Sequence, residues 1–148
     1  MASQQHNGSL YTGQEGILPP EGVYRDARGE IINLPPFPTV GVLVINSRRT
    51  AVRGNHWHAN ESHLMYVASG RMLYIEEDEN GELFTLEMGS QDAVVSPRGR
   101  AHCTVFLEDS VIVVLSDADR TGRRYEDEVV RVPPLNERLD LSRYGLGR

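Results

Sequence analysis

The sequence predicts an all-β protein whose short strands close into a single barrel, and three observations indicate this fold. Short apolar runs rich in Val, Ile, Tyr and Phe recur along the middle of the chain. Turn-forming residues separate these runs at roughly even spacing. Prolines at 19–20 and 35–38 exclude helix near the start. Because open sheet edges invite aggregation, such a meander must close into a barrel or stack as a sandwich.

The expected strands follow one another along the chain at residues 40–45, 64–68, 72–75, 83–88, 93–95, 103–107 and 111–115. Asn80-Gly81, between two such runs, is a strong signal for a tight hairpin. The only plausible helix is short and lies within residues 136–144. We therefore expect a flexible N-terminal tail at 1–16, one barrel domain at 17–131 and a C-terminal extension at 132–148, formed by a short helix or tail.

Composition excludes several classes of function. The chain has 148 residues, 39% of them hydrophobic, and a net charge of −6 without any basic cluster, so we expect no nucleic-acid partner. No stretch reaches the ~18 apolar residues of a membrane helix, which predicts no membrane partner. The single cysteine, Cys103, indicates a reducing, cytoplasmic location. All basic residues are arginine, so neither a lysine Schiff base nor a P-loop is available.

Four of the five histidines lie at predicted strand positions. His56 and His58 are two residues apart, so on a strand both rings point to one face with their Cα atoms ~6.5 Å apart. His63 opens the next strand, and His102 follows the turn at Pro97-Arg98-Gly99. Two ligands from one strand, a third from the next strand and a fourth from a distant hairpin can enclose an ion at the distances typical of imidazole ligands. The pattern predicts a divalent transition metal. Four neutral imidazoles suit Zn, Fe, Ni and Cu alike, and Mn is a further candidate.

Two stretches resemble the paired motifs of the cupin superfamily. Gly54-Asn55-His56-Trp57-His58, followed by His63 and Gly70, is similar to the first motif, and Asp92 to Pro97-Arg98-Gly99-Arg100-Ala101-His102 is similar to the second. The resemblance implies a cupin-type barrel, also described as a double-stranded β-helix or jelly roll. His63 stands where cupins most often have Glu, although some cupins use four histidines. Glu61 is off register, and we expect it behind the ligands or on the surface.

A narrower resemblance connects Asp26-Ala27-Arg28-Gly29-Glu30 and Arg53-Gly54-Asn55-His56-Trp57-His58 to sugar-nucleotide cupins. These are the dTDP-ketohexose isomerases and 3,5-epimerases, which carry a similar Arg-Gly-x-His strand. The resemblance implies that Arg53 binds a phosphate and that His56 acts as the base, without a metal.

Other residues are candidates for supporting roles. Tyr66 and Tyr74 lie on strands near the histidines and could donate a proton or stabilise an oxyanion, with Tyr74 as the catalytic candidate. The alternative for both, which we favour, is aromatic packing on the barrel wall. Arg98 and Arg100 could clamp an anion at the barrel mouth or serve as solvated turn residues. Cys103 should point away from the site as a buried apolar residue. We interpret the acidic run at 76–79 as a solvated hairpin tip.

Three hypotheses for function stay open. The first is a metal-dependent enzyme for a small oxygenated metabolite, with isomerase, lyase or dioxygenase chemistry and His56, Tyr74 and Arg53 as catalytic candidates. The second is a metal-independent isomerase or epimerase of a sugar or sugar nucleotide. The third is a non-catalytic ligand-binding module. In each case a small molecule is the partner, and a homodimer is expected because the extended segments at 19–38 could cover sheet edges of a second copy.

Overall fold

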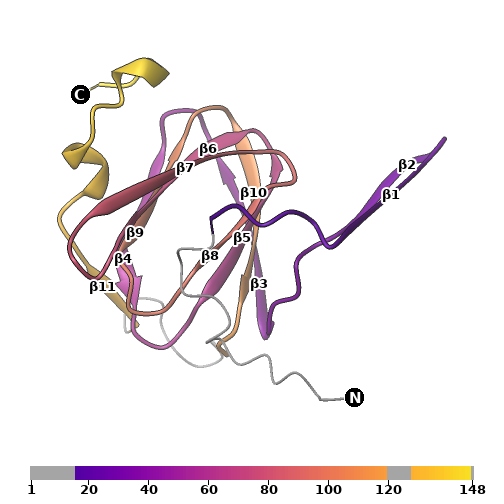
Figure 1. Cartoon of the computed structure of the whole chain (residues 1–148), viewed down its shortest axis with the longest axis horizontal. Helices are drawn as coiled ribbons and strands as arrows, with labels where there is room; N and C mark the ends of the chain where they lie inside the picture. Colours follow the sequence, from indigo (N-terminus) through magenta and orange to yellow (C-terminus); the bar gives the residue numbers. More distant parts are fainter. Residues whose placement is uncertain (1–15, 120–127, 148) are drawn as a thin grey trace.

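Most strands of this chain form two antiparallel sheets that face each other, and a two-stranded ribbon projects from one side (Figure 1). The computed structural model describes residues 16–119 and 128–147. The all-β barrel predicted from the sequence is confirmed. Apart from Gly16, the tail predicted at residues 1–16 lies outside the described residues.

One sheet has five strands in the order β11-β4-β9-β6-β7. Along the chain their bounds are Val52–His58 for β4, Arg71–Glu77 for β6, Leu83–Gly89 for β7, His102–Phe106 for β9 and Val129–Arg131 for β11. β6 and β7 form the hairpin predicted at Asn80-Gly81, and Gly81 has a φ of +78° that suits glycine at this turn.

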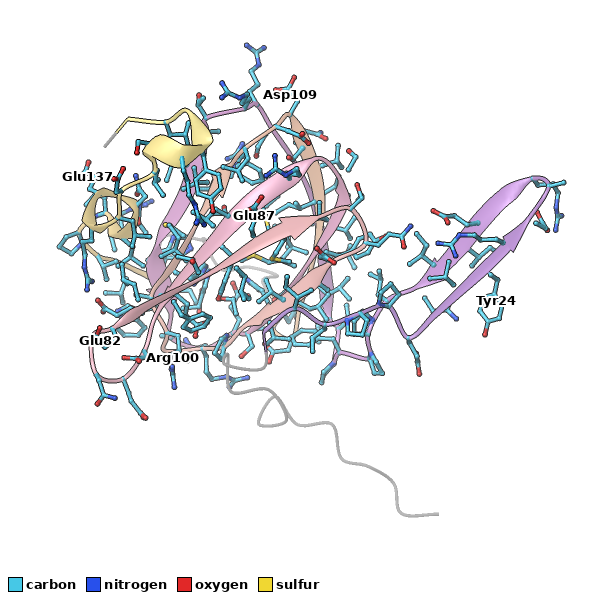
Figure 2. The ribbon with its side chains drawn as sticks, turned by 45° about the horizontal axis from the view of Figure 1, so that its top comes forward. Tyr24, Glu82, Glu87, Arg100, Asp109 and Glu137 are labelled. Carbon is cyan, nitrogen blue, oxygen red and sulfur yellow. The ribbon has the colours of Figure 1, made fainter. Side chains whose placement is uncertain are left out.

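The other sheet has four strands in the order β3-β10-β5-β8. Their bounds are Gly41–Ser47 for β3, His63–Ser69 for β5, Ala93–Ser96 for β8 and Ser110–Ser116 for β10. The ribbon consists of β1 (Gly22–Asp26) and β2 (Gly29–Asn33), two strands beyond those predicted from the apolar runs. Figure 2 shows Tyr24 on this ribbon, well away from the barrel.

The core lies between the two sheets and follows from the period-2 alternation of their strands. Its fully buried members include Tyr74 and Phe106 from the five-stranded sheet and Val67 and Ile112 from the four-stranded one. The outer face of the four-stranded sheet carries Leu64 and Tyr66, which pack with residues of the N-terminal segment. The four-stranded sheet is therefore packed on both faces, against the other sheet and against the N-terminal segment.

The C-terminal residues cover the outer face of the five-stranded sheet (Figure 1). The short helix expected within 136–144 takes the form of two 3-10 turns, η2 (Leu135–Arg138) and η3 (Ser142–Tyr144). Leu135 and Leu141 are buried there in one cluster with Cys103. Among residues 16–119 and 128–147, no helix is long and apolar enough to cross a membrane. The boundary expected between the barrel domain and the extension stays a prediction.

Candidate active site

A β-bulge in β4 determines which side chains of this strand share the interior. Arg53 pairs with Thr104 on β9, Gly54 pairs with Cys103, and the next pair is His56 with His102. The extra residue, Asn55, has a φ of +55°, and Gly54 has a φ of +93°; Asn and Gly are the residues that adopt such values most readily. Without the bulge, residues three apart would point to opposite faces. With it, Arg53 and His56 line the same cavity.

Asn55 also connects the bulge to the C-terminal extension. Its side-chain amide donates to Asn136 Oδ1 at 3.0 Å, and its Oδ1 accepts the backbone N–H of Leu135 at 2.8 Å. Its carbonyl accepts the N–H of Val132. These bonds hold the left-handed conformation of Asn55 in place, so the extension that covers the outer face also stabilises the strand that carries the site.

Three histidines meet on the inner face of the five-stranded sheet. His56 on β4 is paired in register with Arg131 on β11 and with His102 on β9. His58 lies two residues further along β4. The ring of His56 lies 4.7 Å from that of His58 and 5.0 Å from that of His102, between centroids. One nitrogen from each of the three rings falls within 4.8 Å of the others. All three histidines are buried.

His63 comes from β5 in the opposite sheet and belongs to a second, overlapping group with His58 and Glu61. Glu61 Oε1 lies 3.0 Å from His63 Nε2 and 3.2 Å from His58 Nδ1. Its other oxygen accepts a hydrogen bond of 2.8 Å from the Ser116 hydroxyl. Glu61 was expected either behind the ligands or on the surface. It is 1% exposed, so the surface position is wrong, and its carboxylate lies buried between two imidazoles.

His58 is oriented by a second carboxylate. Its Nδ1 lies 2.6 Å from Glu128 Oε2, and the other oxygen of Glu128 accepts the backbone N–H of Asn60 at 2.9 Å. A carboxylate oxygen can only accept, so Nδ1 of His58 carries a proton, and in the neutral imidazole the lone pair is on Nε2. His58 lines the cavity, and Nε2 is the nitrogen suited to accept a proton or bind a metal there.

His102 is oriented in the same sense by different partners. Its Nδ1 lies 2.9 Å from the Ser96 hydroxyl oxygen and 3.2 Å from the carbonyl oxygen of Arg100. Because a carbonyl only accepts, Nδ1 is again the protonated nitrogen. Burial, and then the neighbouring His56 and His58, hold the pKa of His102 well below its ordinary value. The neutral imidazole therefore presents Nε2 as its lone-pair nitrogen.

The histidines line one part of a cavity of about 560 Å³. Its remaining walls are mostly apolar and come from β3, β5 and β10, including Leu43, Met65 and Val114. Among the described residues, the guanidinium groups of Arg53 and Arg131 also line it. Arg53 is held by the Ser47 hydroxyl at 2.8 Å and the Asn46 carbonyl at 3.2 Å. An apolar pocket with a few convergent polar groups and two cations suits a small anionic ligand.

The other candidates named from the sequence take different places. Tyr74 is fully buried; its hydroxyl donates to Glu76 at 2.6 Å, and burial raises its pKa well above the ordinary value. Glu76 is 0% exposed, so the solvated-tip interpretation is wrong for this residue of the acidic run. Tyr66 packs on the outer face. Cys103 points away from the cavity, as expected, and burial raises its pKa to about 12.

Arg98 and Arg100 lie near the turn before His102 without lining the cavity. Arg98 pairs with Asp117 at 2.9 Å, and Arg100 lies 3.8 Å from Glu76 (Figure 2 labels Arg100). Sequence reasoning missed Glu128, Arg131 and Ser96. The first two come from the short strand β11 and the residue before it, which have no alternating pattern long enough to reveal a strand. Ser96 directly precedes the turn at Pro97-Arg98-Gly99, where a serine is common and gives no signal of a functional role.

The residues present fit a metal ion. His56, His58 and His102 offer three imidazole nitrogens at mutually compatible separations. His58 and His102 are each held with Nδ1 protonated by a carboxylate, a carbonyl or a hydroxyl, the arrangement that orients metal-binding histidines. His63 faces Glu61 in this structure, so its place as a fourth ligand stays a prediction.

Comparison with known proteins identifies relatives in fold. The family model described as Cupin matches residues 32–146. No curated protein sequence matches this chain. Among solved structures, ChmJ, a 3'-monoepimerase from Streptomyces bikiniensis in complex with dTDP-quinovose, is similar with a TM-score of 0.71 and 19% identity, over 85% of this chain and 73% of ChmJ.

Two further structures have the same fold. The dTDP-4-dehydrorhamnose 3,5-epimerase from Sulfolobus tokodaii has a TM-score of 0.70 and 18% identity, over 84% of this chain and 78% of the epimerase. QdtA, a sugar 3,4-ketoisomerase from Thermoanaerobacterium thermosaccharolyticum in complex with TDP, has a TM-score of 0.66 and 14% identity, over 88% of this chain and 93% of QdtA. At these identities the likeness shows the fold alone.

Proposed function

The chain belongs to the cupin family, and from this premise we propose that it is an enzyme that isomerises or epimerises a sugar nucleotide by proton transfer. The observation that carries the proposal is the His58–Glu128 pair, whose 2.6 Å contact leaves Nε2 of a cavity-lining histidine as a base. The epimerases and the ketoisomerase with the same fold support the substrate class. A cytoplasmic location, expected from the single cysteine, belongs to the same proposal.

In the proposed reaction, Nε2 of His58 removes the proton on the carbon next to a ketone. Glu128 stabilises the imidazolium that forms. Return of the proton to the opposite face of the same carbon gives an epimer. Return to the former ketone carbon gives an isomer when the hydroxyl on the deprotonated carbon passes its proton to the former ketone oxygen, so no oxidant or reductant is consumed. Arg53 and Arg131 hold the anionic part of the substrate. His56, the base implied by resemblance, lies in register with Arg131 and can serve as the second proton carrier.

Deuterium exchange tests the proposal. The protein is incubated in D2O with TDP-4-keto-6-deoxyglucose, the ligand of a QdtA variant of the same fold, and NMR follows deuterium at the carbon beside the ketone. We expect catalysed exchange that His58→Asn abolishes and Glu128→Gln slows at least 100-fold, from the loss of base and orienting carboxylate. Glu137→Gln, an exposed carboxylate on η2, is the matched control. Exchange at full rate in His58→Asn would contradict the proposed base.

A second candidate function is a metal-dependent enzyme for a small oxygenated metabolite. The three-imidazole group of His56, His58 and His102 favours it. A bound Zn, Fe, Mn, Ni or Cu ion would polarise a substrate oxygen or activate a water, the basis of isomerase, lyase or dioxygenase chemistry. Metal analysis of protein purified without an affinity tag tests it. Stoichiometric metal that His58→Ala removes would favour this function, and near-zero metal would exclude it. Ligand binding without turnover would favour the non-catalytic module.

We also propose a homodimer. Tyr24 and Ile31 are cross-strand neighbours on one face of the ribbon and are 64% and 66% exposed. An isolated two-stranded ribbon is marginal in water and needs a body to pack on. The edge strand β3 offers an apolar stripe, with Val42 and Val44 exposed. A second copy could place its ribbon on this stripe, with the same contact made in reverse.

A further inference from the structure

A chain of buried polar groups leads from His102 away from the cavity. Nδ1 of His102 lies 2.9 Å from the Ser96 hydroxyl, and this hydroxyl is in turn hydrogen-bonded to Tyr74. The Tyr74 hydroxyl lies 2.6 Å from Glu76 Oε1. All four residues are 2% exposed or less: 2% for His102 and Ser96 and 0% for Tyr74 and Glu76. The chain connects three strands, β9, β8 and β6.

Only one assignment of donors and acceptors is consistent along this chain of hydrogen bonds. The Glu76 carboxylate accepts, so the Tyr74 hydroxyl must donate to it. The Tyr74 oxygen then accepts from Ser96, and the Ser96 oxygen accepts from Nδ1 of His102. The backbone carbonyl of Arg100, 3.2 Å from the same Nδ1, requires the same direction because it cannot donate. Two independent acceptors therefore demand a proton on Nδ1.

The burial of these polar groups carries a free-energy cost. Burying a hydroxyl, a phenol and a carboxylate costs stability that apolar residues of similar volume would not lose. The hydrogen bonds within the chain offset part of this cost, and they restrict the arrangement of its members. The arrangement specified here ends on a histidine that lines the cavity. Tyr74, by contrast, is not among the residues that line it.

We propose that Ser96, Tyr74 and Glu76 form a positioning relay that holds His102 as the Nδ1–H tautomer, with Nε2 presented to the cavity. Tyr74 then acts through His102, and it does not donate a proton to the substrate. The relay serves His102 equally as a proton carrier or as a metal ligand. The proposal rests on the histidine-lined cavity being the functional site, but its main test does not depend on turnover.

The test is the tautomer of His102, read from two-bond 1H–15N correlation spectra of the metal-stripped protein at pH 8. In the wild type we expect a protonated Nδ1 and an unprotonated Nε2 for His102, assigned by its loss in His102→Gln. Ser96→Ala should raise the population of the Nε2–H tautomer, and Ser96→Thr should restore the wild-type spectrum. Tyr74→Phe, which keeps the ring, should move the population in the same direction.

Ser116→Ala is the matched control, because it removes another buried hydroxyl, the one that donates to Glu61 on the opposite side of the site. It should leave the His102 tautomer unchanged. An Nε2–H tautomer in the wild type overturns the proposal, and so does a His102 spectrum that responds alike to Ser96→Ala and Ser116→Ala. Where deuterium exchange is catalysed, Ser96→Ala should slow it on the order of 10- to 100-fold with recovery in Ser96→Thr. Absence of exchange would contradict the proposed function and leave the tautomer test intact.

Discussion

The bulge in β4 gives the sharpest prediction for stability, through the substitution Gly54→Ala. A Cβ at this position would lie 2.9 Å from the His102 carbonyl oxygen and 3.0 Å from Cys103 Cα. Both atoms belong to the backbone of β9 and cannot rotate away, so relief of the contact needs separation of two paired strands. In addition, Gly54 has a φ of +93°, which L residues rarely adopt.

The two costs can be separated. The backbone conformation costs about 1–2 kcal/mol for alanine, and overpacking against backbone costs about 1–3 kcal/mol more. The sum is a loss of about 2–5 kcal/mol in the free energy of unfolding. At the 2–4 °C per kcal/mol typical of a domain this size, the midpoint of thermal unfolding should fall by about 4–20 °C.

Gly81→Ala supplies the control. Gly81 has a φ of +78°, but an added Cβ meets nothing within 4 Å, so only the backbone cost of about 1–2 kcal/mol applies. Urea denaturation of both variants and the wild type measures the difference. Gly54→Ala should lose more stability than Gly81→Ala, and it should also weaken ligand binding because Arg53 and His56 depend on the bulge. Equal losses in the two variants would refute the steric reasoning.

Three further predictions concern other parts of the molecule. Because burial raises the pKa of Cys103 from 9.0 to about 12, the folded protein should resist alkylation at pH 8, while urea exposes the thiol; fast modification without urea would contradict this burial. The same shift means that protonated Cys103 contributes stability below pH 9 that is lost as the pH rises toward 12. Tyr24→Glu should give a monomer by light scattering, whereas Arg25→Ala, at the next position of the ribbon, should stay dimeric; a monomeric wild type would refute the dimer. Arg131→Gln should weaken binding of TDP about 10-fold by calorimetry, with Arg71→Gln unchanged; equal affinities would remove Arg131 from the site.

The fold and the histidine cluster could be predicted because both depend on short-range patterns. Alternation along a strand puts His56 and His58 on one face whatever the rest of the chain does. Strand-length apolar runs and Asn80-Gly81 predict most of the barrel and its clearest hairpin. His102 follows a turn whose glycine and proline are visible in the sequence. The structure places His56, His58 and His102 in one group, and His63 in a second group with His58 and Glu61.

The remaining parts of the site depend on pairings between distant segments. The bulge at Gly54-Asn55 shifts the alternation of β4 by one residue. Regular alternation, which is all that the sequence indicates, would place Arg53 and His56 on opposite faces of the strand. Glu128 reaches His58 because a three-residue strand, β11, pairs with β4, which is too short a segment to predict. Glu76 looked solvated because it begins an acidic run. Its burial follows from its place on β6, where it is paired in register with His102 on the adjacent strand β9.

The central claim, that the histidine-lined cavity transfers protons through His58 without a metal, has one direct test. Deuterium exchange into TDP-4-keto-6-deoxyglucose is measured with protein from which all metal has been removed by chelation, and metal analysis verifies the removal. The proposed reaction predicts that exchange continues at the rate of the untreated protein and that His58→Asn abolishes it. Exchange that disappears with the chelator and returns with one specific ion would contradict the claim and establish the three-imidazole group as a catalytic metal site.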